Sequence, residues 1–257
     1  MNGLHQLASL WRAKSHSPMP YKLDSKIVAA AIKVSILTNT PPSFPFTLKF
    51  DTPIPQPLPG ISHLLPELGT RLLKQWPAIS LDDTFVSIIH DLNTMTRYTE
   101  AVGDRVFPYI EDNSHLEYIN YLIMEVEHRL LSYRTMGVVD AACRTTCLLY
   151  LNTVLVRGWS NNAAVIRSLV EQLRDVLNID SNEWSGLEDV LLWVAFIGAS
   201  CSHRPADAMF FTVLFEKQTL MLGLDSCEQV LKMLSRYMFV GRVHGVSLHR
   251  LWGTVKH

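Results

Sequence analysis

Apolar residues recur at helical spacing along most of the chain, and this pattern constrains the fold more than any other feature. Stripes with intervals of three or four residues predict amphipathic helices that bury one face. They run through segments 4–11, 80–102, 114–134, 138–159, 162–177 and 226–240. Ser226, with Gln229 three residues later, predicts a capping box at the start of the last of these helices. No segment alternates with the period of two that a half-buried strand shows. The sequence therefore predicts an all-α fold, an irregular bundle of about eight to ten helices that forms a single domain over residues 1–257.

Residues 40–60 interrupt the helical pattern, because they contain seven prolines. Proline has no backbone N–H, so the segment is neither a helix nor a central strand. Three phenylalanines, Phe44, Phe46 and Phe50, are interleaved with the prolines. This interleaving favours an ordered, proline-rich segment that crosses the surface of the bundle. A ligand for a proline-recognition domain is the alternative interpretation.

The most apolar stretch, "DVLLWVAFIGASCSHRP" at residues 189–205, raises the question of a membrane anchor. The run from Val190 to Cys201 is 12 residues long, whereas a helix needs roughly 20 apolar residues to cross a bilayer. We therefore interpret the stretch as a central core helix with Trp193 and Phe196 packed between its neighbours. Burial of such side chains contributes about 1.5–3 kcal/mol each.

The charge balance bears on partners and on location. The chain has 23 basic and 24 acidic residues, and this argues against direct nucleic acid binding, which normally requires a basic surplus. Its four cysteines lie within apolar helical patterns, which fits a reducing compartment. The first residues lack the charged leader and apolar core of a secretory signal. We expect an intracellular protein, in the nucleus or cytoplasm, with no membrane segment.

No motif of a known catalytic site is recognisable. Cys143 and Cys147 share a helix face, but no further pair of cysteines or histidines completes a metal site, so core packing is the favoured interpretation. Residues 198–202, "GASCS", lack the second glycine and the preceding strand of a nucleophile elbow. The pair Asp82 and Asp83 is placed at a helix start, where the dipole favours acids. We expect no metal and no cofactor, and the catalytic residues of any activity are unknown.

Three segments, read in order, follow one known pattern. They are "ACRTTCLLYLNTVL" (142–155), "LLWVAFIGAS" (191–200) and "SCEQVLKMLSRYMFVGRVHGVSLHRLW" (226–252). They resemble the C-terminal half of the fungal-specific transcription factor domain, the helical regulatory region downstream of zinc-cluster DNA-binding modules. In that family a helix reading roughly "A-C-R-x-A-x-L-L-Y-L-N-T" precedes one reading "L-L-W-x-L-F-x-G". The basic segment with six cysteines that forms the zinc cluster has no counterpart here.

The resemblance implies a transcription-factor-like regulatory or interaction module without its own DNA reader, tied to fungal secondary-metabolite biosynthesis. Such a module would act through a protein partner or an apolar small molecule. The alternative is a repurposed helical scaffold that acts as a metal-independent cyclase or pericyclase of the Diels–Alderase type. That enzyme would hold a terpenoid or polyketide intermediate in a reactive conformation within an apolar pocket. The sequence leaves both readings and the oligomeric state open.

Six residues are candidates for binding an apolar ligand. The aromatic residues would line a pocket in the core, and the polar residues at the end of the pocket would bind the polar groups of the ligand. For His203, a simple stabilising role at the C-terminus of an apolar helix is the favoured reading, because the helix dipole attracts a cation there. The candidates are Trp193, Phe196, Tyr150, Tyr121, His203 and Arg204.

Overall fold

The computed structural model describes residues 21–43, 45–46, 48, 65–79, 82–106, 114–156, 163–179 and 182–255. These parts contain ten α-helices and no strand, so the all-α prediction and the expected number of helices are confirmed. The short helix expected near residues 4–11 lies outside the described residues, as does most of the proline-rich segment 40–60.

The helices follow the predicted stripes closely. A five-residue π-helix, Leu151–Leu155, continues α6, and a 3₁₀ turn, Asn182–Trp184, precedes α8. The α-helices are α2 (Tyr21–Thr38), α3 (Thr70–Ile79), α4 (Asp83–Val106), α5 (Ser114–Ser132), α6 (Val138–Tyr150), α7 (Ala163–Leu177), α8 (Glu188–Cys201), α9 (Pro205–Met221), α10 (Cys227–Leu234) and α11 (Gly241–Val255).

Local side-chain chemistry explains several helix starts. The Asp82 carboxylate accepts a hydrogen bond from the N–H of Phe85 at 3.0 Å, which caps α4. The Ser226 hydroxyl accepts one from the N–H of Gln229 at 3.2 Å, as predicted for the start of α10. The Gln229 side chain completes the box one residue earlier than expected, because its oxygen accepts from the N–H of Asp225 at 2.8 Å. α9 begins directly on Pro205, whose fixed φ suits a first helical turn.

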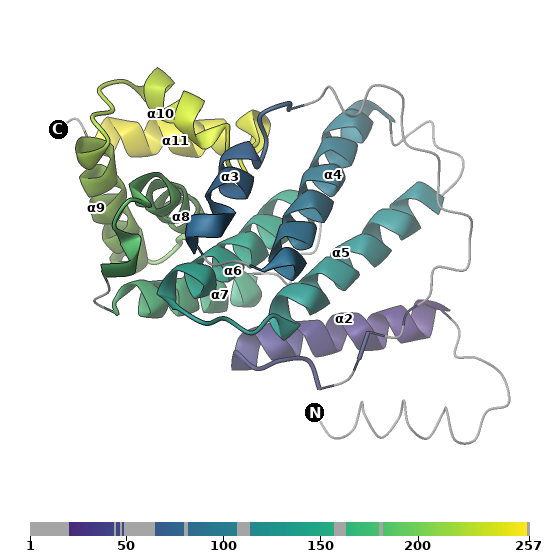
Figure 1. Cartoon of the computed structure of the whole chain (residues 1–257). Coiled ribbons are helices and arrows are strands. Elements are labelled where there is room, and N and C mark those ends of the chain that lie inside the picture. The colour runs from purple at the N-terminus through teal and green to yellow at the C-terminus, as the bar shows by residue number, and fades with distance from the viewer. Residues whose placement is uncertain are drawn as a thin grey trace, which may run out of the picture.

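α8 lies inside the bundle, and its neighbours decide where the candidate residues point. It packs against α6, α7, α9 and α11, and Figure 1 shows α9 on its outer side, at the edge of the molecule. At the other end of the fold, α2 packs against α5 and α7, and α4 packs against α5. None of the described helices has the length and apolar character to span a membrane.

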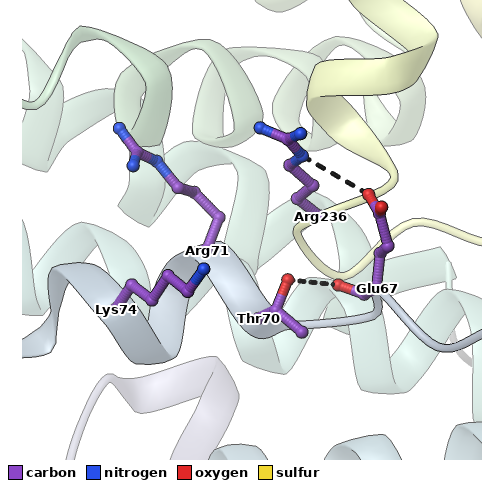
Figure 2. A pocket seen from close by; sticks show the side chains of 5 residues that line it. All are labelled: Glu67, Thr70, Arg71, Lys74 and Arg236. Carbon is purple, nitrogen blue, oxygen red and sulfur yellow. Dashed lines mark hydrogen bonds and ion pairs between the residues drawn. The ribbon is translucent and has the colours of Figure 1, made fainter.

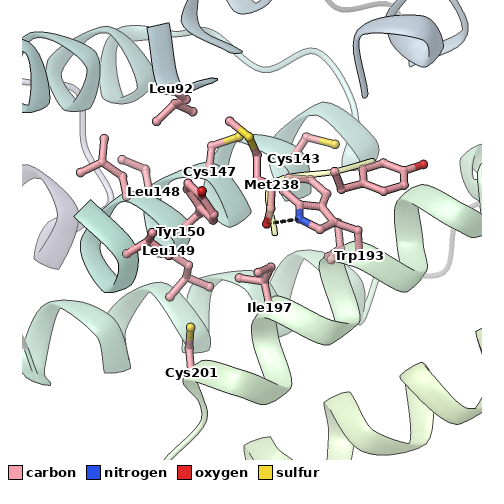
Figure 3. Packing of buried hydrophobic residues seen from close by; sticks show 14 of the residues in the cluster. Leu92, Cys143, Cys147, Leu148, Leu149, Tyr150, Trp193, Ile197, Cys201 and Met238 are labelled. Atoms are coloured by element: carbon pink, nitrogen blue, oxygen red, sulfur yellow. Dashed lines mark hydrogen bonds between the residues drawn. The ribbon is translucent and has the colours of Figure 1, made fainter. Parts of the chain in front are cut away.

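One hydrophobic core cluster connects these helices, and it extends from α2 to α11. Within it, Cys143 and Cys147 of α6 and Cys201 of α8 are buried among leucine, isoleucine and aromatic side chains (Figure 3). The interpretation of Cys143 and Cys147 as core residues is therefore confirmed. α8 is buried along almost its whole length, which confirms that the apolar residues from Val190 to Cys201 lie in a core helix.

Candidate functional site

Trp193 and Phe196 lie fully buried on α8. The Trp193 indole stacks on Tyr237 with ring centroids 5.6 Å apart, and its Nε1 donates a hydrogen bond to the Met238 carbonyl at 3.3 Å (Figure 3). The ring of Phe196 lies 5.5 Å from that of Phe239. Both side chains thus anchor residues 237–239, the segment that leads into α11, against the core helix.

His244 of α11 joins these aromatic residues to α6. Its ring centroid lies 5.7 Å from that of Phe196, 5.3 Å from Phe239 and 5.9 Å from Tyr150. Its Nδ1 accepts a hydrogen bond from the N–H of Val240 at 3.0 Å. Burial lowers the pKa of His244 to about 4, so the ring is neutral near neutral pH and acts here as a packed, hydrogen-bonded aromatic group.

Tyr150 is the third fully buried candidate. Its hydroxyl lies 3.0 Å from the hydroxyl of Thr96 on α4, which satisfies its hydrogen-bonding need inside the core. Burial raises the pKa of Tyr150 well above its ordinary value. The side chain is therefore a neutral phenol, and it can hydrogen-bond but cannot act as a base.

The remaining three candidates lie elsewhere. Tyr121 is half-buried on α5, with its ring 5.6 Å from that of Phe46. His203 and Arg204 are exposed between α8 and α9, and Arg204 forms ion pairs with Glu171 and with Asp207. The structure thus groups Trp193 with Phe196 and Tyr150, and it separates them from the other three. Ligand binding by any of the six stays a prediction.

The buried residues around Trp193, Phe196 and Tyr150 have the chemical properties of core residues. Within the residues that the structure describes, no group of three or more histidine, cysteine or acidic side chains could hold a metal ion. Burial raises the pKa of the Cys201 thiol to about 12, and it also raises those of Cys143 and Cys147. The three thiols are therefore protonated and are poor nucleophiles.

A comparison with protein families identifies the domain. The model of the fungal specific transcription factor domain matches residues 79–252. The chain belongs to this family. No curated protein and no solved structure matches the chain. In this fungal transcription factor domain, α4 to α11 fall almost entirely within the matched residues, whereas α2 precedes them and α3 ends where they begin.

The positions that carry the family pattern in α8 have a packing role. Leu191, Leu192, Trp193 and Phe196 are all buried. Gly198 completes the pattern, and Phe211 of α9 occupies the space that a side chain there would need. In the fungal transcription factor domain this signature therefore specifies how α8 fits its neighbours. It does not by itself mark a ligand site.

The fungal transcription factor domain exposes apolar side chains on the outside of α9. Met209, Val213 and Leu220 are spaced by four and seven residues, so they share one helix face. They expose 71%, 59% and 74% of their surface, and the neighbouring Met221 is also exposed. The opposite face of α9 buries Phe211 and Phe215 against the core. We call Met209, Val213, Leu220 and Met221 the α9 outer face.

Sequence reasoning missed two ion pairs that join distant helices. The Nε of Arg71 on α3 donates to the carboxylate of Asp189 on α8 at 2.5 Å. Arg174 of α7 donates to Asp207 of α9, also at 2.5 Å. Both aspartates are almost fully buried and stand in the first turn of an apolar helix. An aspartate in the first turn of an apolar helix could have indicated such an ion pair from the sequence alone, because a buried carboxylate needs a partner.

Proposed function

We propose that this domain regulates transcription through a partner protein that binds the α9 outer face. The observation that carries the proposal is that α9 presents apolar side chains on both sides, one toward the core and one toward solvent. Apolar side chains that are gathered on one exposed helix face often mark an interaction site. Contact with an apolar partner surface removes the outer side chains from water, and this supplies the driving force for association.

The composition of the face suggests the kind of partner. Met209, Val213 and Leu220 follow one line along α9, which suits an amphipathic helix laid alongside. Lys217 is exposed between Val213 and Leu220, and an acidic side chain on the partner would complement it. We therefore infer an amphipathic partner helix with apolar anchors and at least one acidic flanking residue.

A reporter assay tests this mode of action. The full chain is fused to a heterologous DNA-binding module, and reporter output is measured for the double variant Val213→Glu/Leu220→Glu. We expect at least a 5-fold change in output at unchanged protein level and melting temperature, because two charges in the face oppose burial. The matched control is Val246→Glu, since Val246 is an isolated apolar residue on α11 with 82% of its surface exposed. Equal output from the parent fusion and the double variant would contradict the proposal.

We further place the action of the domain in the nucleus and its target genes in secondary-metabolite biosynthesis. Deletion of the gene, followed by transcript and metabolite profiling, tests this assignment. Loss of the transcripts of one biosynthetic pathway supports it. Normal transcripts with accumulation of one apolar intermediate would contradict it and favour the cyclase or pericyclase alternative. In that alternative, a ligand would have to displace packed neighbours such as Met238 and Phe239 from Trp193 and Phe196.

A further inference from the structure

A polar pocket lies between α3 and the segment that follows α10, on a different part of the fold from the α9 outer face. It has a volume of about 270 Å³ and is lined by Glu67, Thr70, Arg71, Lys74 and Arg236 (Figure 2). Three of these five side chains are cations. The pocket thus differs in character from the aromatic core around Trp193, and its lining points to a charged ligand.

The walls of the pocket are held together by the backbone. The N–H of Arg71 donates to the carbonyl of Arg236 at 2.9 Å, and the N–H of Gly69 donates to the carbonyl of Tyr237 at 3.2 Å. These bonds connect the start of α3 to residues 236–237, although the two segments are far apart in sequence. The backbones of the two walls are therefore fixed next to one another before any ligand arrives, which reduces the ordering that binding requires.

The cations outnumber the acids that neutralise them. Arg71 pairs with Asp189 at 2.5 Å, and Arg236 pairs with Glu67 at 3.3 Å. Lys74 is exposed, and no ion pair joins it to another described residue. Three cations thus face two carboxylates. The pocket also lies at the N-terminus of α3, whose first turn contains no acidic residue, so the positive end of the helix dipole adds to this excess.

Glu67 occupies the position that an anionic ligand would take. Its side chain is 56% exposed, and that of Arg236 is 42% exposed. An ion pair so open to water contributes little to stability, so an incoming anion can replace the Glu67 carboxylate at low cost. Figure 2 shows Glu67 and Arg236 reaching toward each other from opposite walls. Once Glu67 turns away, Arg236 and Lys74 both become available to a ligand.

We propose that this pocket binds a compact dianion, either a phosphate monoester or a dicarboxylate carried by a small metabolite. Lys74 and Arg236 contact the ligand directly, and Arg71, which is paired with Asp189, lines the α3 wall. The pocket volume is sufficient for a small anionic group. Because the ligand touches both walls, its binding strengthens the attachment of α3 to residues 236–237. This inference goes beyond the proposed function and does not depend on the α9 outer face.

The test uses the full chain and two probes, inorganic phosphate and succinate. Binding is measured by calorimetry at constant ionic strength, with sodium chloride replacing the probe in the reference titration. We expect saturable binding of at least one probe in the millimolar range or tighter. Lys74→Gln and Arg236→Gln should each weaken it at least 5-fold, since a cation that contacts the anion is lost. Glu67→Gln should tighten it about 3-fold or more, since the internal competitor for Arg236 is lost.

Two controls separate a specific site from a general charge effect. Lys217→Gln removes an exposed cation on α9, and Glu228→Gln removes an exposed acid on α10; each matches the charge change of a pocket variant. Neither should alter affinity by more than about 1.5-fold, because neither residue lines the pocket and salt screens charges that do not contact the ligand. The probe that binds more tightly assigns the ligand class. The proposal is overturned if neither probe saturates, or if Lys217→Gln weakens binding as much as Lys74→Gln.

Discussion

Glu127 of α5 is a fully buried acid that is hydrogen-bonded to Asn152, whose Nδ2 donates to Glu127 Oε1 at 2.8 Å. Burial raises the pKa of Glu127 to about 7, and this outweighs the opposing effects of Asn152 and of the Lys33 charge. The folded state therefore holds a proton on Glu127 at pH values where the unfolded chain has released it. The stability that results is fully present below about pH 4.5 and is lost as the pH rises through 7.

The variant Glu127→Gln isolates this effect, because glutamine keeps an acceptor for Asn152 but cannot ionise. Relative to the parent chain, the variant should gain about 3 kcal/mol in the free energy of unfolding between pH 4.5 and pH 8. Urea unfolding at several pH values measures this difference. Other titrating groups, such as His244, contribute equally to both proteins and cancel. A difference that stays constant over this range would show that Glu127 is ionised in the folded state.

At the scale of elements, Gly198 sets how closely α8 approaches α9. A Cβ at this position would lie 2.4 Å from the ring of Phe211, which is itself fully buried and has no room to move away. We therefore expect Gly198→Ala to lower the free energy of unfolding by about 1–3 kcal/mol through overpacking. Chemical denaturation measures the loss.

Gly245 of α11 provides the matched control for Gly198. It also lies inside a helix, and a Cβ there would meet no heavy atom of the described residues within 4 Å. Gly245→Ala should leave the stability unchanged or raise it by up to about 1 kcal/mol, because alanine favours helix more than glycine does. Equal losses from the two alanine variants would mean that helix propensity, and not the approach of α9, explains the effect at Gly198.

Two differences from the sequence prediction show what local patterns leave out. The helix expected over residues 226–240 ends at Leu234, since the carbonyls of Tyr237 and Met238 bind Gly69 and Trp193 instead of continuing the helix. The helix expected over residues 138–159 changes to π-helix at Leu151, where the Asn152 side chain bonds to the carbonyl of Leu148 and to Glu127. In both cases a partner from a distant segment overrides the local helical preference, so periodicity alone could not predict the change.

At the scale of the whole molecule, apolar spacing was sufficient to predict the helices and the burial of Trp193, Phe196 and Cys143, because each depends on residues within a few turns. The contacts between helices could not be read in this way. Arg71 and Asp189 are 118 positions apart, and the local sequence around one residue does not identify the other as its partner. The polar pocket at Arg236 and the α9 outer face could not be predicted from the sequence for the same reason, since each depends on which surfaces stay exposed after the helices have packed.

The Arg71–Asp189 pair joins α3 to the part of the chain that matches the family, and its removal should destabilise the whole fold. The Asp189 side chain is 5% exposed, so Arg71→Met leaves a buried carboxylate beside neutral groups: the Gln75 amide, the N–H of Val190 and the Tyr237 phenol. We expect the free energy of unfolding to fall by about 1–3 kcal/mol.

Asp189→Asn in the Arg71→Met background should restore part of this loss, because no buried charge then lacks its partner. Urea denaturation of the single and double variants measures the coupling between the two residues. Arg250→Met, at an exposed arginine of α11, is the control and should change the stability by less than about 0.5 kcal/mol. If Arg71→Met proves as mild as Arg250→Met, water or a rearranged side chain solvates Asp189, and α3 is then held by the core packing of Leu72 and by its backbone bonds to residues 236 and 237.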